Sequence, residues 1–197
     1  MEPQRQQSET GRQLADNIQA NEKFVDREYP HENFISDVKQ LQTKNKYSKG
    51  LIIPENVKLA ESRIPKNSEQ RRTLRKELKQ AGILSRQGNS VYLTPEPGKY
   101  KKRVADAMVN GVPFEFRNIT GKNRQVEQEF SDAKIKDKAA NVFMNIDSDL
   151  SRDEVRRRIA MVIDRHPDYT GEIVVSFQGK STYFWDTGNF REKKPLP

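Results

Sequence analysis

The dipeptide Asn110-Gly111 constrains the fold of this chain more than any other short stretch. Asn-Gly between alternating apolar residues is the strongest short-range signal for a two-residue β-hairpin turn. Counting outward from this turn places Asp106 directly opposite Glu115. Opposed side chains in a hairpin have Cβ atoms about 4.5–5.5 Å apart, and like charges there are destabilising. The sequence therefore predicts a hairpin over residues 104–119 that holds two carboxylates against each other.

Strand alternation predicts which side chains share a face with these carboxylates. Phe114 and Phe116 would point into a core, whereas Glu115 and Arg117 would join Asp106 on the opposite face. Such a cluster is tolerated if Arg117 neutralises one carboxylate, or if one carboxyl keeps its proton through a raised pKa. A divalent cation bridging the two carboxylates would also stabilise it.

Two alternatives that give this stretch no catalytic or metal-binding role stay open. The carboxylates can simply be solvated on an exposed sheet face beside Arg117. Alternatively, Tyr100, Val104 and Met108 recur at helical spacing, so residues 99–109 can form a helix that ends at Gly111. The carboxylate pairing would then disappear.

Composition excludes several classes of site. The 197 residues include no cysteine and two histidines, which excludes disulfides, zinc–thiolate sites, thiol nucleophiles and a His-rich metal site. No apolar run approaches the about 20 residues that span a bilayer, and no secretory signal is evident. We therefore expect a cytoplasmic protein with no membrane partner.

Charge is distributed unevenly along the chain. The net charge is +8, and residues 66–197 carry all of the excess, with 26 Lys/Arg against 18 Asp/Glu. A basic excess confined to one segment is expected of a protein that binds a polyanion such as nucleic acid.

Periodicity predicts an N-terminal segment, one main domain and a tail. Residues 1–65 are predicted to be helical or partly disordered, with a short helix over 34–45, and residues 191–197 form a polar tail. The main domain over 66–190 combines helices and strands in an order that favours an α+β fold with a twisted, mainly antiparallel sheet and helices on one face. Its predicted elements are helices at 68–81, 123–139 and 151–165, a strand at 140–146, and hairpins turning at Gly88-Asn89, Asn110-Gly111 and Gly179-Lys180.

The last hairpin predicts a second polar surface. A two-residue turn at Gly179-Lys180 sets Ser176 opposite Tyr183, and places both with Trp185 on the face away from the core. Aromatic side chains beside basic residues on an open sheet can stack on unpaired bases. The alternative is that a helix covers them and they are ordinary core residues.

Basic residues cluster in a loop and on a helix. The loop NITGKNR precedes a predicted helix N-terminus, a natural place for phosphate, although it lacks a Walker pattern. Its candidate phosphate contacts are Asn118, Thr120, Gly121, Lys122 and Arg124. The basic residues of the helix over 68–81 either face phosphate or are solvated, and the same holds for the lysines at 134, 136 and 138.

These motifs together resemble a known class of toxin. The runs ADAMVNGVPFEFRNITG, ANVFMNI, SRDEVRRRIAMVI and EIVVSF resemble the C-terminal tRNA-nuclease domains of bacterial contact-dependent growth-inhibition toxins. They are also similar to related nuclease domains of phages and integrative conjugative elements. These domains are grouped with the barnase/EndoU/colicin/RelE-like ribonucleases, and the resemblance covers about residues 66–188.

The resemblance implies cleavage of RNA, expected to be tRNA, without a cofactor. It also implies that the domain can be delivered into other cells as part of a larger protein. A toxin of this kind would need a dedicated immunity protein, which we expect to be acidic so that it covers the basic surface.

The resemblance implies roles for the matching residues. Asp106, Glu115 and Arg117 would be catalytic, with Glu115 accepting the proton of a ribose 2′-OH and Arg117 or Lys122 holding the phosphate. The family pattern has lysine at the position of Arg117, and arginine does not release its proton, so a proton-transfer role there is excluded. The residues expected to bind substrate are Asn118, Thr120, Lys122, Arg124, Ser176, Tyr183 and Trp185.

Two other functions stay open. The same residues look like the D…ExK core of PD-(D/E)xK nucleases, in which Asp106 and Glu115 would hold Mg²⁺ and Arg117 would polarise the attacking water. A catalytically inactive nucleic-acid-binding module would instead merely tolerate the acidic pair.

Overall fold

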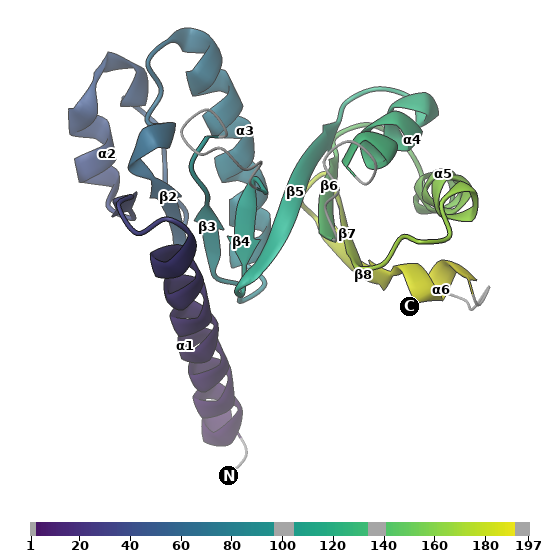
Figure 1. The fold of residues 1–197 in the computed structure, drawn as a ribbon, viewed down its shortest axis with the longest axis horizontal. Helices are drawn as coiled ribbons and strands as arrows, with labels where there is room; N and C mark the ends of the chain where they lie inside the picture. The colour runs from purple at the N-terminus through teal and green to yellow at the C-terminus, as the bar shows by residue number, and fades with distance from the viewer. Residues whose placement is uncertain (1–2, 97–104, 134–140, 192–197) are drawn as a thin grey trace. The chain divides into compact units, whose positions relative to one another are not determined.

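The computed structural model describes residues 3–96, 105–133 and 141–191 (Figure 1). The chain divides into two compact units, Met1–Val112 and Pro113–Pro197. The predicted α+β class applies to both, since each combines helices with a sheet. No helix within the described ranges is long and apolar enough to cross a membrane.

The described part of the first unit contains four short strands. Its strands pair in sequence order, β1 with β2 and β3 with β4 antiparallel, and β2 with β3 parallel. Its elements are α1 (Pro3–Glu28), β1 (Phe34–Ile35), α2 (Val38–Lys44), the 3₁₀ turns Lys46–Ser48 and Glu61–Arg63, β2 (Val57–Ala60), α3 (Ser68–Ser85), β3 (Val91–Leu93) and β4 (Ala107–Val109).

The predicted domain boundary after residue 65 is wrong. Val57 of β2 pairs with Val91 of β3, so the sheet joins residues from both sides of that boundary. Arg63 reinforces the connection, because its Nη1 lies 2.6 Å from Glu77 Oε2 on α3. The prediction missed the short strand β2 in this polar segment, because its pairing partner β3 lies more than 30 residues further along the chain.

The predicted helix over 68–81 is confirmed but runs four residues further, to Ser85. Asn67 is its N-cap, since the Asn67 side chain accepts a hydrogen bond from Gln70 N at 2.8 Å. The predicted hairpin at Gly88-Asn89 is wrong, because Ile83 and Leu84 belong to the buried side of this helix and only the second half of the stretch forms a strand.

The turn at Asn110-Gly111 is confirmed. Both residues have positive φ, 51° and 79°, as a type I′ turn requires. The buried Asn21 of α1 accepts a hydrogen bond from Gly111 N and donates one to Ser90 O at 3.1 Å, which fixes the helix against the turn. Residues 107–109 form β4, contrary to the alternative helix over 99–109, of which residues 99–104 lie outside the described ranges.

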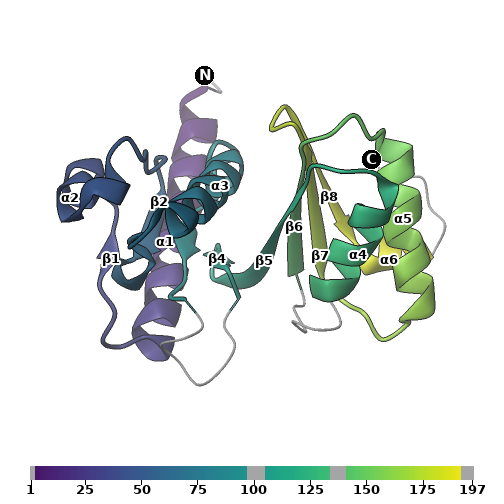
Figure 2. The ribbon, with the colours of Figure 1, turned by 90° about the horizontal axis from the view of Figure 1, so that it is seen from above.

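The second unit alternates strands and helices before a final hairpin. β5 pairs with β6 and β6 with β7 in parallel, and β7 pairs with β8 antiparallel. Figure 2 shows α4 and α5 covering the same face of these strands, as predicted. The elements are β5 (Val112–Ile119), α4 (Asn123–Ser131), β6 (Asn141–Ile146), α5 (Arg152–Arg165), β7 (Glu172–Phe177), β8 (Ser181–Asp186) and α6 (Thr187–Arg191).

Local signals place the helices of this unit correctly. α5 follows the predicted start and begins at a capping box, in which Glu154 N donates to Ser151 Oγ and Ser151 N donates to Glu154 Oε2. α4 begins at Asn123 as predicted, while residues 134–139 of that predicted helix, with its lysines, and residue 140 of the predicted strand lie outside the described ranges. Residues 192–197 of the predicted tail also lie outside them, and α6 was not predicted.

The last hairpin has a different register from the predicted one. Phe177 pairs with Ser181, so the loop has three residues, with Gln178 and Gly179 both at positive φ. This shift pairs Ser176 with Thr182, not with Tyr183. Because side chains alternate along a strand, Tyr183 then faces the same side as the core residue Val175.

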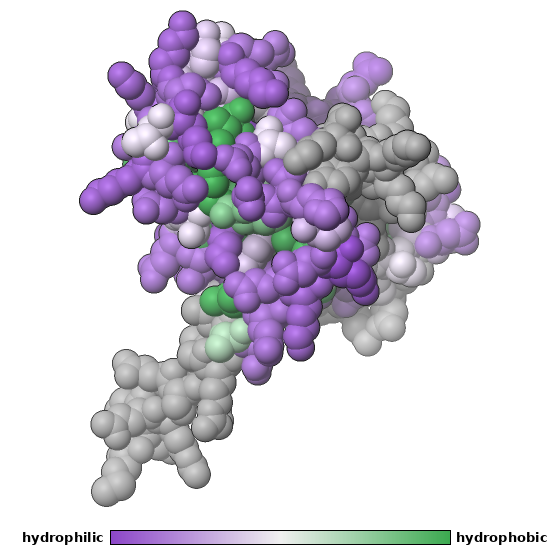
Figure 3. All heavy atoms as spheres, turned by 60° about the vertical axis from the view of Figure 1, so that its left-hand side comes forward, coloured by the Kyte–Doolittle hydropathy of each residue, from purple (hydrophilic) through white to green (hydrophobic). Residues whose placement is uncertain are grey.

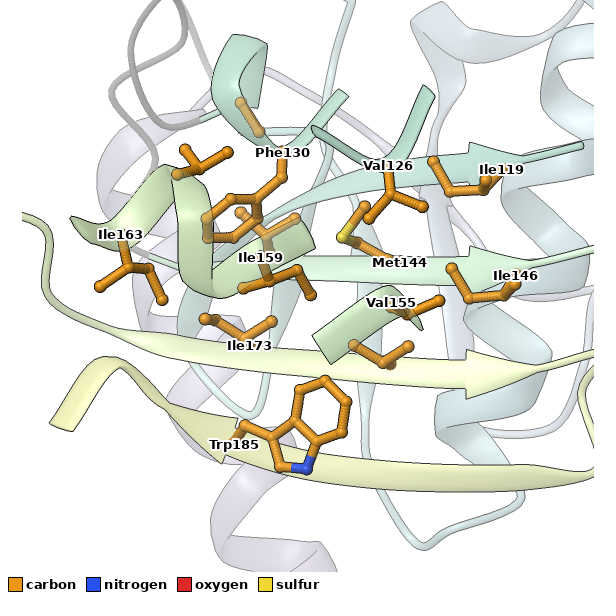
Figure 4. Packing of buried hydrophobic residues seen from close by; sticks show 14 of the residues in the cluster. Ile119, Val126, Phe130, Met144, Ile146, Val155, Ile159, Ile163, Ile173 and Trp185 are labelled. Atoms are coloured by element: carbon orange, nitrogen blue, oxygen red, sulfur yellow. The ribbon is translucent and has the colours of Figure 1, made fainter. Parts of the chain in front are cut away.

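The core of the second unit lies between its sheet and the two helices (Figure 4). Ile119, Met144 and Ile173 from the strands meet Phe130 of α4 and Ile159 of α5. Trp185 on β8 is also part of this core.

Replacing Ile159 by alanine is expected to lower the free energy of unfolding of the second unit by about 2–5 kcal/mol, because the deletion leaves a cavity. Trp185 is the only tryptophan and is buried in the same core, so its fluorescence during urea unfolding reports on this unit. Ile52→Ala is the control, since Ile52 lies in the first unit and is 71% exposed. Equal effects of the two variants would contradict this core.

Candidate functional site

Glu115 and Arg117 project from β5 toward the face that the helices cover. Glu115 pairs with Val142 and Arg117 with Met144, and both of these partners belong to the core beneath α4 and α5. The alternative in which these charged residues are solvated on an exposed sheet face is therefore wrong. Phe116 lies on the other face against Phe143, with ring centroids 5.4 Å apart, and is buried as well. Alternation alone could not assign the faces because β5 is buried on both sides here.

One guanidinium serves two carboxylates at this place. Arg117 Nη1 lies 3.1 Å from Glu115 Oε2 and donates to the Phe116 carbonyl at 2.9 Å. Arg117 Nε lies 3.5 Å from Oε2 of Glu129 on α4. Glu115 is only 4% exposed, so the pair lies largely outside bulk solvent, where charges interact more strongly.

Sequence reasoning missed Glu129. The spacing that turns Val126 and Phe130 toward the sheet also brings Glu129, one residue before Phe130, close to β5. An acidic residue beside the apolar stripe of a predicted helix was the signal that could have found it.

Asp106 lies in the first unit, just before β4. Its backbone carbonyl accepts hydrogen bonds from Thr94 N and from Arg63 Nη2, both at 3.1 Å. The Asp106 charge also contributes to the environment of Glu77, whose pKa is raised mainly by burial and is held down in part by Arg63. The predicted opposition of Asp106 and Glu115 joins residues of the two units and stays a prediction.

The loop before α4 is occupied by a side chain of the protein itself. Gly121 N and Thr120 N donate to Gln125 Oε1, at 2.6 and 3.1 Å. The Gln125 amide oxygen thus takes the place that a phosphate oxygen was expected to take. The Thr120 and Lys122 side chains are exposed. Gln125, which the sequence analysis did not consider, would have to move before these backbone donors could bind phosphate.

Asn118 and Ser176 belong to one polar row across three strands. Asn118 pairs with Asn145, and Asn145 pairs with Ser176. Asn145 Nδ2 donates to Asn118 Oδ1 at 2.7 Å, while Asn145 Oδ1 and Ser176 Oγ are buried and find no hydrogen-bond partner in the described part of the chain. Asn145 was missed, although a polar residue inside the apolar run ANVFMNI was a readable signal.

Tyr183 and Trp185 are not on an open stacking surface. Trp185 is 2% exposed and packs edge-on against Phe190, with centroids 5.6 Å apart. Tyr183 stacks on Trp185, and Arg152 lies 4.2 Å from the Tyr183 ring centroid. The expectation that these residues stack on bases is wrong for Trp185, and the alternative that they are core residues describes it correctly.

Arg124 lies on α4 near the ion pairs that join this helix to α5. Glu127 Oε1 lies 2.7 Å from Arg165 Nη1, and Glu127 Oε2 lies 3.4 Å from Arg158 Nη1. The hydrogen bond from Arg165 is the largest cause that lowers the pKa of Glu127 below its ordinary value.

The basic excess lies in the first unit. Residues 66–112 carry 11 Lys/Arg and 4 Asp/Glu, whereas residues 113–197 carry 15 and 14. Much of it is on α3, where Arg72, Arg75, Lys76 and Lys79 are exposed. The surface drawn in Figure 3 is accordingly mostly hydrophilic, with a limited band of hydrophobic side chains.

The acidic and histidine side chains of the described ranges do not form a metal-binding cluster of three or more. The Mg²⁺ site predicted under the alternative function, from Asp106 and Glu115, stays a prediction.

No protein-family model and no curated protein matches this chain. A chain of a CdiA-CT/CdiI toxin and immunity complex from Burkholderia pseudomallei is similar to it, with 22% sequence identity and a TM-score of 0.47. The match covers 70% of this chain and 95% of that chain. Nuclease activity and an RNA substrate stay predictions.

Replacing Glu127 by glutamine is expected to lower the melting temperature at pH 7, because the charge that holds Arg158 and Arg165 is lost. A lowered pKa means that this stabilisation is present above the pKa of the unfolded chain, about 4.3, and is lost as the pH falls through the folded value. The difference from wild type should therefore shrink as the pH falls below about 4.3 toward the lowered folded value. Glu172→Gln, at an exposed position, is the matched control, and a difference from wild type that stays constant as the pH falls would refute this explanation.

Proposed function

We propose that the second unit is a ribonuclease domain whose reaction centres on Glu115 and Arg117. The observation that carries this proposal is the buried carboxylate held 3.1 Å from a guanidinium on the same strand. Buried ionisable groups with a specific charged partner are concentrated at functional sites. A carboxylate that accepts a proton and a guanidinium that holds a phosphate supply two of the functions that cleavage at a ribose 2′-OH requires.

The roles of the two residues follow from their chemistry. Glu115 accepts the 2′-OH proton as the 2′ oxygen attacks phosphorus, and Arg117 stabilises the charge that develops on the phosphoryl oxygens. The longer of the two ion pairs of Arg117, to Glu129 at 3.5 Å, is the one that a phosphate would replace. Arginine keeps its proton, so the departing 5′ oxygen takes its proton from another acid or from water.

The substrate and setting are part of the same proposal. Cleavage of tRNA, delivery into other cells and an acidic immunity protein come from the sequence resemblance. The basic surface of α3 in the first unit supports a polyanionic substrate, because exposed cations raise the local concentration of nucleic acid.

A metal-dependent nuclease is the second candidate. Its support is that Glu115 and Glu129 share one cation, and that β5, β6 and β7 are parallel with a helical crossover. The carboxylates of Glu115 and Asp106 are oxygen donors of the kind that Mg²⁺ prefers. When bound, Mg²⁺ would supply an activated water.

Glu115→Gln is expected to reduce cleavage of total tRNA about 10²–10⁴-fold, the contribution of a general base, while leaving the Trp185 emission spectrum unchanged. Cleavage is followed on denaturing gels with EDTA and separately with Mg²⁺, and the exposed Glu172→Gln variant is the control.

Cleavage in EDTA that Glu115→Gln abolishes supports the metal-independent ribonuclease. Cleavage only with Mg²⁺ moves the assignment to the metal-dependent class. Normal cleavage by Glu115→Gln would refute both, and salt-sensitive RNA binding without any cleavage would leave a nucleic-acid-binding module.

Arg117→Lys tests how the cation acts. If Arg117 holds phosphate with two donors, lysine keeps the charge but loses one charged hydrogen bond, and kcat/KM in EDTA should fall about tenfold or more. Single-turnover cleavage of one purified tRNA measures the change. If the lysine variant cleaves as well as wild type, and both cleave only with Mg²⁺, the residue at position 117 instead polarises a water, as in the metal-dependent class.

A further inference from the structure

A groove of about 520 Å³ runs between α4 and α5. Three arginines line it, Arg124 from α4 and Arg158 and Arg165 from α5, together with His166 at the end of α5. Glu127 is the acidic residue of this lining. With histidine neutral, the groove therefore carries an excess of two positive charges.

The guanidinium of Arg158 is incompletely satisfied. Its Nη1 lies 3.4 Å from Glu127, but its Nε is buried and finds no acceptor within the described ranges. A buried charged donor without an acceptor is costly, so an additional oxygen acceptor would stabilise this side chain. Arg124 is exposed and supplies a second cation at the same groove.

We propose that this groove binds a phosphoryl group. Guanidinium donors match the oxygens of a phosphoryl group in a planar, two-pronged geometry, and three arginines converge here. Gln128 and Ser131 add neutral donors, and Val162 is the one apolar side chain of the lining, so the groove does not suit an apolar ligand. The phosphoryl group can come from the backbone of an RNA strand or from a small free phosphoanion.

The helix α4 links this groove to the candidate catalytic pair. Glu127 contacts the arginines of α5, whereas Glu129 contacts Arg117 on β5. An RNA strand that binds in the groove would thus lie along the helix that borders Glu115 and Arg117. This source of the phosphoryl group rests on the proposed ribonuclease function, whereas a free phosphoanion does not.

The test measures binding and needs no cleavage. A fluorescein-labelled 2′-O-methyl RNA dodecamer in EDTA is the first probe, because it has no free 2′-OH to attack and no metal is present. Pyrophosphate, titrated by calorimetry, is the second. Arg158→Gln and Arg124→Gln remove groove cations, and Arg157→Gln removes an exposed arginine next to Arg158 that does not line the groove.

We expect each groove variant to weaken RNA binding about tenfold, the effect of losing one charged hydrogen bond. The slope of log K against log salt should fall by about 0.7 for each lost phosphate contact. Arg157→Gln should match wild type. If Arg158→Gln proves unfolded by Trp185 fluorescence, Arg124→Gln, at an exposed position, still carries the test.

Loss of RNA binding in the groove variants alone identifies the RNA backbone as the source. Unchanged RNA binding with weakened pyrophosphate binding identifies a free phosphoanion. If neither probe distinguishes the groove variants from Arg157→Gln, the proposal is overturned. None of these binding measurements involves Glu115. They can therefore fail while the nuclease is active, or succeed while the nuclease is inactive, and the two proposals are tested separately.

Discussion

The burial of β6 on both faces is the constraint on which the second unit depends. All six of its residues are buried, and both of its neighbours run parallel to it. Parallel neighbours require crossover connections, and here α4 and α5 provide them on one face. That covering determines the environment of Glu115 and Arg117, because their register with Val142 and Met144 directs them beneath the helices.

A carboxylate in that position needs a cation. Removing one partner of a buried ion pair is strongly destabilising, yet the pair as a whole commonly contributes no more stability than well-packed apolar residues would. Stability alone therefore gives no reason to have Glu115 and Arg117 there in place of the valine and isoleucine side chains found elsewhere on the same face. A chemical role gives such a reason, and it is consistent with a guanidinium shared between Glu115 and Glu129.

Local signals in the sequence were sufficient for the turn at Asn110-Gly111 and for the starts of α3, α4 and α5. The Asn110-Gly111 turn and the Ser151–Glu154 capping box depend only on residues next to each other in the chain. The predicted register of the last hairpin was wrong because Gln178 adopts a positive φ, which is not expected for a glutamine. The predicted faces of β5 were wrong because they depend on its non-local pairing with β6. The predicted unit boundary was wrong because it depends on the non-local pairing of β2 with β3. The sequence was sufficient to identify Glu115 and Arg117 as candidate site residues. Glu129, Gln125 and Asn145 could be identified only from their tertiary contacts.

The two units differ in how they can attract a polyanion. Long-range attraction depends on net charge, and residues 66–112 supply nearly all of the excess with 11 cations against 4 anions. The second unit, with 15 against 14, has almost none to offer at a distance. It can hold a phosphate only where its own folding gathers cations, and α4 and α5 do so by converging Arg124, Arg158 and Arg165 on one groove. Screening over about 8 Å in physiological salt makes such local clusters, and not the overall charge, decide where a bound strand lies.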